Sequence, residues 1–82
     1  MEFKRGQVVV STAGHDKGEL FVVAGFDKNR VLLCNGKQRK LSKLKAKNPK
    51  HIAETGILSD EDSMATDRKI RKTLNKSANP GG

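Results

Sequence analysis

Two short apolar runs on either side of a glycine-bounded turn constrain the fold of this chain more than any other feature. The runs Val8–Val10 and Leu20–Val23 are rich in β-branched and aromatic residues, which favour strands. The turn Gly14–Gly18 begins and ends with glycine, which permits positive φ and close approach to the backbone. Asp16 is expected to accept hydrogen bonds from backbone amides there, with Lys17 at the tip. The sequence therefore predicts a β-hairpin whose loop offers N–H donors and a cation to a phosphate group.

Turn-forming residues divide the first two-thirds of the chain into five expected strands. The expected ranges are Gln7–Ser11, Leu20–Phe26, Val31–Cys34, Lys37–Leu41 and His51–Ala53. The pair Asn35-Gly36 predicts a tight type I′ turn between the third strand and the fourth. Five short strands within about fifty residues predict a mainly β fold, a small SH3-like five-stranded barrel. Period-two alternation assigns its interior to Val8, Val10, Val22, Ala24, Val31, Leu33 and Leu41, with Phe21 and Phe26 at the ends.

Positive charge is concentrated in the N-terminal two-thirds of the chain. Lys and Arg number 17 against 9 Asp and Glu in 82 residues, for a net charge of +8. Residues 1–52 hold 12 basic and 4 acidic side chains, whereas residues 53–82 hold 5 of each. Such a field attracts a polyanion and steers its association. Because the charges lie on strand-like sequence and not along an amphipathic helix, they favour nucleic acid over a membrane surface.

Signals for other classes of protein are missing from the sequence. No apolar run approaches the roughly 20 residues that span a bilayer, and Met1 is not followed by the apolar stretch of a secretory signal. Cys34 has no second cysteine to pair with, so we interpret it as a strand residue in the reducing cytoplasm. One cysteine and two isolated histidines predict neither a metal site nor a cofactor. An enzyme is not expected, because no nucleophile–base pair, carboxylate pair or phosphate loop is found.

The motifs around the first hairpin resemble a known family. The segments Gly6–Val10 and Ala13–Val23 resemble the KOW motif of ribosomal and transcription-factor proteins, a strand–loop–strand unit with an essential glycine. Arg30–Lys40 and Lys47–Ile52 are similar to one KOW branch, the archaeal and eukaryotic large-subunit ribosomal protein fourteen with its short bacterial relatives. The resemblance covers residues 6–54. It implies an SH3-like barrel that binds ribosomal RNA through the KOW loop and basic segments.

The expected RNA contacts lie on the loop and on the basic segment that follows the third strand. Gly18 matches the essential glycine of the family, and His15 stands where the family often carries an arginine. Lys43, Lys45 and Lys47 alternate with Leu44 and Ala46, so an extended chain would present them on one face. The expected RNA-binding residues are Gly14, His15, Lys17, Gly18, Lys37, Arg39, Lys40, Lys43, Lys45, Lys47 and Lys50.

The mode of RNA binding follows from the residues that the chain lacks. Trp and Tyr are absent and the 3 Phe are mostly assigned to core positions, so a stacking platform for single-stranded bases is not expected. Cations and backbone amides would contact the phosphates, 2′-hydroxyls and shape of a structured RNA. Lys17, Arg39 and Lys40 are the strongest candidates. The expected partners are ribosomal RNA and ribosomal proteins, and the free protein is expected to be monomeric.

The C-terminal third predicts a helix. Ser59 and Thr66 can each cap the N-terminus of a helix, because acidic residues suited to a first helical turn follow both of them. Residues 68–76 are expected to form the helix, with basic side chains toward its C-terminal end. Ile70 and Leu74 are spaced i,i+4 and are expected to dock on the barrel with Met64 or Leu58. The alternative is that Arg68, Arg71 and Lys72 join the RNA surface. The expected organisation is a barrel over residues 1–54, a linker and capping helix over 55–76, and a disordered tail over 77–82.

A protein-interaction module of the translation or transcription machinery is the competing function. SH3-like barrels also bind peptides, and the KOW domains of elongation factors contact proteins beside RNA. Peptide-binding SH3 domains use grooves lined by aromatic side chains. With 3 Phe as its whole aromatic content, this chain favours RNA binding.

Overall fold

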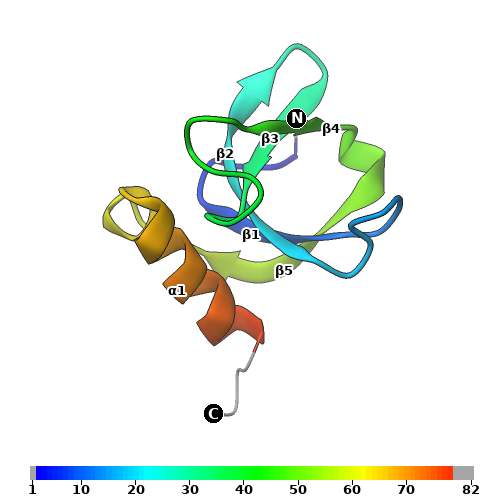
Figure 1. The fold of residues 1–82 in the computed structure, drawn as a ribbon. Coiled ribbons are helices and arrows are strands. Elements are labelled where there is room, and N and C mark those ends of the chain that lie inside the picture. The colour runs from blue at the N-terminus through cyan, green and yellow to red at the C-terminus, as the bar shows by residue number, and fades with distance from the viewer. Residues whose placement is uncertain (1, 79–82) are drawn as a thin grey trace.

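Five antiparallel strands form one sheet, and a single C-terminal helix packs against it (Figure 1). This computed structural model describes residues 2–78. The strands are β1 (Gln7–Ser11), β2 (Leu20–Asp27), β3 (Arg30–Cys34), β4 (Lys45–Lys47) and β5 (Ile52–Leu58), in the spatial order β4-β3-β2-β1-β5. The 3₁₀ turns η1 (Pro49–His51) and η2 (Asp62–Met64) precede β5 and the helix α1 (Asp67–Ala78), respectively. The predicted fold class, mainly β with a C-terminal helix, is confirmed.

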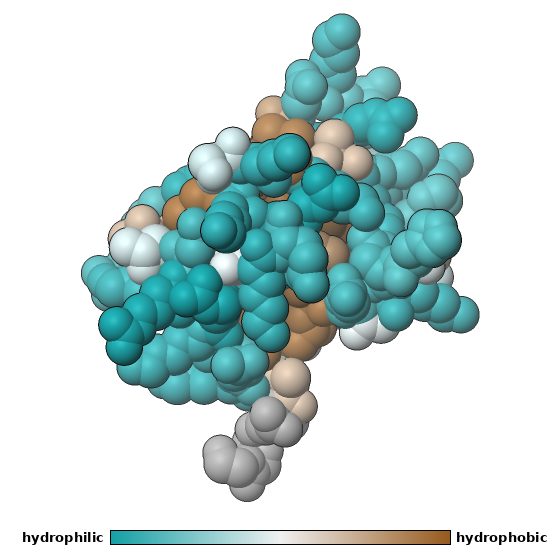
Figure 2. Space-filling view, in the orientation of Figure 1, coloured by the Kyte–Doolittle hydropathy of each residue, from teal (hydrophilic) through white to brown (hydrophobic). Residues whose placement is uncertain are grey.

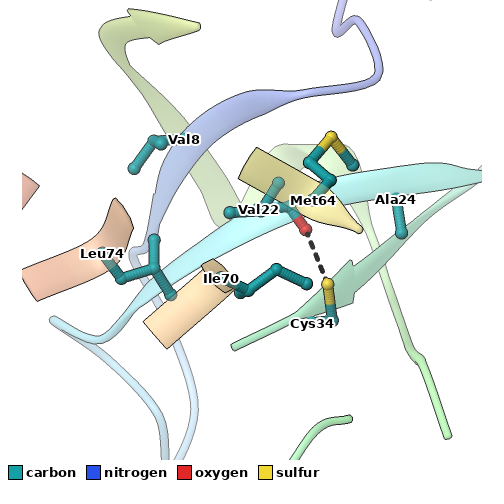
Figure 3. Packing of buried hydrophobic residues seen from close by; sticks show 7 residues of the cluster. All are labelled: Val8, Val22, Ala24, Cys34, Met64, Ile70 and Leu74. Carbon is teal, nitrogen blue, oxygen red and sulfur yellow. Dashed lines mark hydrogen bonds between the residues drawn. The ribbon is translucent and has the colours of Figure 1, made fainter. Parts of the chain in front are cut away.

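The sheet is buried on both faces, and this corrects the predicted interior. One face consists of Val9, Phe21, Val23, Val31, Leu33 and Ile52. The opposite face consists of Val8, Val22, Ala24 and Cys34, which Met64, Ile70 and Leu74 cover (Figure 3). Val31 and Leu33 lie where expected, but Val8 and Val22 face the helix. Alternation could not decide between the faces, because β1 and β2 are apolar at neighbouring positions and both faces are covered.

Helix α1 forms the cover of the second face. Thr66 caps it, since its hydroxyl accepts a hydrogen bond of 3.2 Å from the Lys69 N–H. Ile70 is fully buried and Leu74 is nearly so, both against the sheet and Met64 (Figure 3). The predicted docking is confirmed with Met64 as the partner. Leu58, the other expected partner, is instead 65% exposed.

The expected fourth strand is wrong. Residues 36–44 form bends and turns, and the strand that pairs with β3 is Lys45–Lys47. The side-chain oxygen of Asn35 accepts hydrogen bonds from the Lys37 N–H (2.9 Å) and the Arg39 N–H (3.0 Å). These bonds replace a ladder that lysine-rich sequence supports poorly. Gly36 has φ +74°, but Asn35 does not have positive φ, so the type I′ turn is also wrong.

The ends of the described chain extend the elements expected there. β5 continues to Leu58, beyond the expected barrel boundary at residue 54. Helix α1 includes Ser77 and Ala78, while residues 79–82 of the expected tail lie outside the described residues. Across residues 2–78 no helix has both the length and the apolar character that crossing a membrane requires.

Candidate nucleic-acid interface

Two loops emerge from the same end of the sheet. The first loop (residues 12–19) leads into β2, and the second loop (residues 35–44) follows β3. The antiparallel register pairs Val22 with Cys34, which brings the start of β2 beside the end of β3. Asp27 pairs with Arg30 at the opposite end, where the β2–β3 turn lies. Strand pairing therefore places the two loops together and separates them from the β2–β3 turn.

A buried cluster of charges holds the first loop from inside. The carboxylate of Asp16 accepts hydrogen bonds from the Ser11 hydroxyl (2.7 Å) and from the ammonium groups of Lys45 (2.7 Å) and Lys47. Lys47 also donates to Ser11 (2.7 Å) and to the Ala13 carbonyl (2.9 Å). Asp16 was expected to accept from backbone amides, so this prediction is corrected. Lys45 and Lys47 do share one face of their strand, as expected, but that face is turned toward Asp16.

The cluster keeps Asp16 ionised. Burial alone would raise the pKa of this carboxyl, but hydrogen bonds from Lys45, Lys47 and Ser11 together outweigh burial and hold the pKa well below its usual value. Lys47 is itself only 8% exposed, so two charges of opposite sign are buried together. A buried ion is tolerated when it is paired and hydrogen-bonded, and here both conditions are met.

The same cluster shows that the sheet is curved. β4 and β1 are separated by β3 and β2 in the sheet, which along a flat sheet would place them roughly 14 Å apart. Lys47 on β4 nevertheless hydrogen-bonds Ser11 on β1 directly. Curvature of this kind resembles that of a small barrel and brings β4 over the first loop.

The outer side of the first loop is open to solvent. His15 and Lys17 are exposed, and a Cβ built on Gly18 would meet no atom within 4 Å. Gly18 has φ +90°, so glycine is required there by backbone conformation and not by crowding. Its N–H donates to the Ser11 carbonyl (2.8 Å). The Gly18 amide, expected to contact phosphate, is therefore already satisfied within the loop.

Helix α1 and the side chain of Asn35 hold the second loop. Arg71 donates to the Gly36 carbonyl (2.6 Å), and the Leu41 N–H donates to the Asp67 carboxylate (2.8 Å). A Cβ at Gly36 would overlap the Asp67 carbonyl oxygen, so only glycine allows this close approach. The helix therefore supports the loop as well as covering the sheet.

Most basic side chains of this region point outward without an acidic partner. Residues 28–53 contain nine Lys or Arg and no Asp or Glu. Lys45 and Lys47 belong to the buried cluster. No side-chain hydrogen bond or ion pair within residues 2–78 engages Lys17, Lys37, Arg39, Lys40, Lys43 or Lys50. Lys50 lies on η1, which the hydrogen bond from the Thr12 N–H to the His51 carbonyl (2.9 Å) ties to the first loop.

Two shallow depressions lie along the loops. One, of about 250 Å³, lies between the loops and is lined by His15, Asp16, Glu19, Phe21, Asn35, Gln38, Arg39 and Lys45. The other, of about 270 Å³, lies against the helix and is lined by Gly18, Glu19, Leu20, Asn35, Lys37, Gln38, Arg71, Leu74, Asn75 and Ala78. Hydrophilic side chains dominate the visible face, with hydrophobic surface between them (Figure 2). Sequence reasoning missed Glu19 and Gln38, which line both depressions, because no local pattern brings their loops together.

Exposed cations and polar side chains, with one buried cysteine nearby, make up this end of the described molecule. Cys34 is buried beneath the helix, and burial raises the pKa of its thiol to about 11, so it remains protonated at neutral pH. Within residues 2–78 no group of three or more His, Cys, Asp or Glu side chains is placed to hold a metal ion. The remaining features are exposed cations and polar side chains around two depressions, which suit an anionic polymer.

Comparisons with known proteins leave the family of the chain open. No protein-family model matches it, and no curated protein matches its sequence. The resemblance to KOW proteins therefore rests on the motifs quoted from the sequence, and function is inferred from the two loops.

Proposed function

We propose that this chain binds the phosphate backbone of a structured RNA with the two loops at one end of its sheet. One observation carries the proposal: the register of β2 and β3 gathers cations, exposed except for the half-buried Arg39, that have no acidic partner within residues 2–78. Cations that neutralise phosphates release the counterions condensed on the nucleic acid, and this release is a major source of affinity. Phosphate contacts would fix the protein on the RNA.

Fewer residues are proposed to contact the RNA than the sequence predicted. The contacting cations are Lys17, Lys37, Arg39, Lys40, Lys43 and Lys50. Lys47 is left out because it is buried in the cluster under the first loop. Lys45, with its side chain 29% exposed, is assigned the same positioning role through Asp16. His15 and Gly14 lie on the exposed side of the first loop, where they can approach the RNA backbone.

A structured RNA suits this surface better than an unfolded single strand. Single-strand binders stack successive bases on aromatic side chains. Phe21 is buried in the sheet, and the partly buried Phe3 packs against the same cluster of core residues. Phe26 is 42% exposed but lies next to the β2–β3 turn, at the end of β2 away from the loops. Cations that contact phosphates would recognise the shape of a folded RNA instead.

Ribosomal RNA in the cytoplasm is the proposed target, on the basis of the resemblance to ribosomal KOW proteins. A buried, protonated thiol fits a reducing compartment. Sedimentation of a cell lysate through a sucrose gradient, with and without ribonuclease, tests this part. Co-migration of the tagged chain with large ribosomal subunits through a moderate salt wash is expected. Migration at the top of the gradient in both samples would show that the chain does not associate stably with ribosomes.

A charge-matched pair of variants tests RNA binding itself. Lys37→Ala/Arg39→Ala removes two cations from the second loop, and Lys28→Ala/Arg30→Ala removes two from the opposite end of the β2–β3 ladder. Each lost phosphate contact lowers the magnitude of the salt slope by about 0.7–0.9. The loop variant should therefore lose about 1.5 from the slope across RNAs of unrelated sequence, while the turn variant retains it. Equal losses in both variants, or a flat salt titration of the wild type, would contradict the proposal.

A protein-interaction module is the second candidate, and the edge strand β5 favours it. Ile57 and Leu58 are 38% and 65% exposed on β5, which within residues 2–78 pairs with β1 along one edge and leaves its other edge open. Exposed apolar residues on a strand with an open edge are a site where another chain can pair. Leu58→Gln, which removes the apolar side chain without changing the charge, should abolish capture of a partner protein and leave RNA affinity unchanged. Loss of RNA affinity in this variant would place the nucleic acid on β5.

A further inference from the structure

We infer that the depression between the second loop and α1 binds one unpaired guanine base of the RNA. The inference rests on the proposed RNA-binding function and adds a base-specific contact to it. The side chain of Glu19 prompts this inference. Its carboxylate is exposed beside the cations of both loops, and it makes no side-chain hydrogen bond or ion pair within residues 2–78.

A free carboxylate is unfavourable on a surface that only binds phosphates. It repels the RNA backbone and weakens the field of neighbouring cations. Asp16, the other acidic residue of this loop, is neutralised by two lysines, whereas Glu19 has no such partner. A carboxylate can instead accept hydrogen bonds from the N–H groups of a base edge. Glu19 therefore suits a base that presents adjacent N–H donors.

Gln38 supplies the complementary donor. Its side-chain oxygen accepts a hydrogen bond from the Asn35 amide (3.2 Å), which leaves its own NH₂ group available. Glu19 and Gln38 line the same depression, so an acceptor and a donor border one space. The Watson–Crick edge of guanine carries the matching set: a carbonyl oxygen, then two adjacent N–H donors. Adenine and the pyrimidines lack this order of groups.

The space and its surroundings also suit one base. The depression measures about 270 Å³, just below the roughly 300–1,000 Å³ of pockets that hold drug-sized ligands. Leu20 and Leu74 give it an apolar wall against which a base can lie. Lys37 and Arg71 border it with positive charge for the flanking phosphate. Figure 2 shows hydrophobic surface among hydrophilic side chains close to the end of the described chain.

Bulged RNA duplexes test the inference with the full-length chain. One duplex carries a single unpaired guanosine, and matched duplexes carry adenosine, inosine or no bulge. Wild type should bind the guanosine bulge about tenfold more tightly than the adenosine bulge or the plain duplex. Inosine, which lacks the exocyclic NH₂ group, should fall between them. Equal affinity for all four duplexes would overturn the inference and leave the proposed function standing.

The variant Glu19→Gln separates base recognition from simple electrostatics. Loss of a negative charge alone would strengthen binding to every RNA. Base recognition predicts that the guanosine preference disappears, while the plain duplex binds as well as before or better. Asp27→Asn, which removes the same charge at the far turn, should keep the preference. If Glu19→Gln also keeps it, Glu19 does not read the base; if wild type binds none of the duplexes, the proposed function itself fails.

Discussion

The first loop is held from inside by a buried ion pair, whereas the second loop is held by hydrogen bonds to the Asn35 side chain and to single side chains of helix α1. Asp16, Lys45 and Lys47 form the support of the first loop, and Asn35 and Arg71 form most of the support of the second. Both loops present cations, and we expect their anchors to respond differently to acid and to substitution. The difference shows that some lysines of one basic segment anchor a buried carboxylate while others remain exposed, depending on which side of the chain they occupy.

The largest effect is expected from breaking the charged anchor. Asp16→Asn leaves Lys47 buried without a counter-ion, and uncompensated buried charges destabilise a protein by about 3–5 kcal/mol. Urea unfolding of the full chain measures this loss. Asp27→Asn, an exposed carboxylate in the opposite turn, should change the free energy of unfolding by less than about 0.5 kcal/mol.

A double variant tests whether the unpaired buried lysine causes the instability of Asp16→Asn. Combining Asp16→Asn with Lys47→Met removes both charges of the buried pair, so that no buried charge is left without its counter-ion. We expect the double variant to recover most of the stability lost in Asp16→Asn. If both proteins are equally unstable, the ion pair is not the cause of the loss.

Acid should weaken the first loop through the same carboxylate. The pKa of Asp16 is lowered in the folded protein, so its ionisation stabilises the fold at any pH above the unfolded-state pKa of about 3.9. Below that pH the unfolded chain takes up a proton that the folded chain excludes, and this stabilisation is progressively lost. The free energy of unfolding should therefore fall more steeply in wild type than in Asp16→Asn between about pH 5 and pH 2.

Other carboxylates do not obscure this comparison. The Ser63 backbone N–H lowers the pKa of Asp60, and the hydrogen bond from Arg5 lowers that of Glu61. Both groups titrate in wild type and in Asp16→Asn, so their effects cancel in the difference. Parallel pH profiles for the two proteins would show that Asp16 is not responsible.

A smaller effect is expected from the neutral anchor of the second loop. Asn35→Ala removes the acceptor of the Lys37 and Arg39 amides, and each hydrogen bond contributes about 0.5–1.5 kcal/mol. We expect a loss of about 1–2 kcal/mol in urea unfolding, with no change in acid sensitivity. Asn29→Ala, in the exposed β2–β3 turn, is the matched control. A loss as large as that of Asp16→Asn would erase the contrast between the loops.

Local sequence patterns correctly predicted the elements whose structure depends little on residues distant in the sequence. The first hairpin follows from two β-branched runs around a glycine turn, and α1 follows from the Thr66 cap and the i,i+4 pair Ile70 and Leu74. The fourth strand was predicted at the wrong residues, because residues 37–41 are mostly Lys, Arg and Gln and have poor β propensity. The Asn35 side chain, which satisfies their backbone amides, forms the loop instead.

The sequence by itself determined that this chain forms a basic, mainly β fold with a C-terminal helix, because charge, turn residues and apolar runs act locally. Only the tertiary structure decided which face of β1 and β2 meets the helix, since both faces are apolar enough to be buried. It also decided that Lys45 and Lys47 anchor Asp16 while Lys37 and Lys43 remain exposed. A lysine's role depends on whether curvature of the sheet brings a carboxylate to it, and that contact joins residues about thirty positions apart.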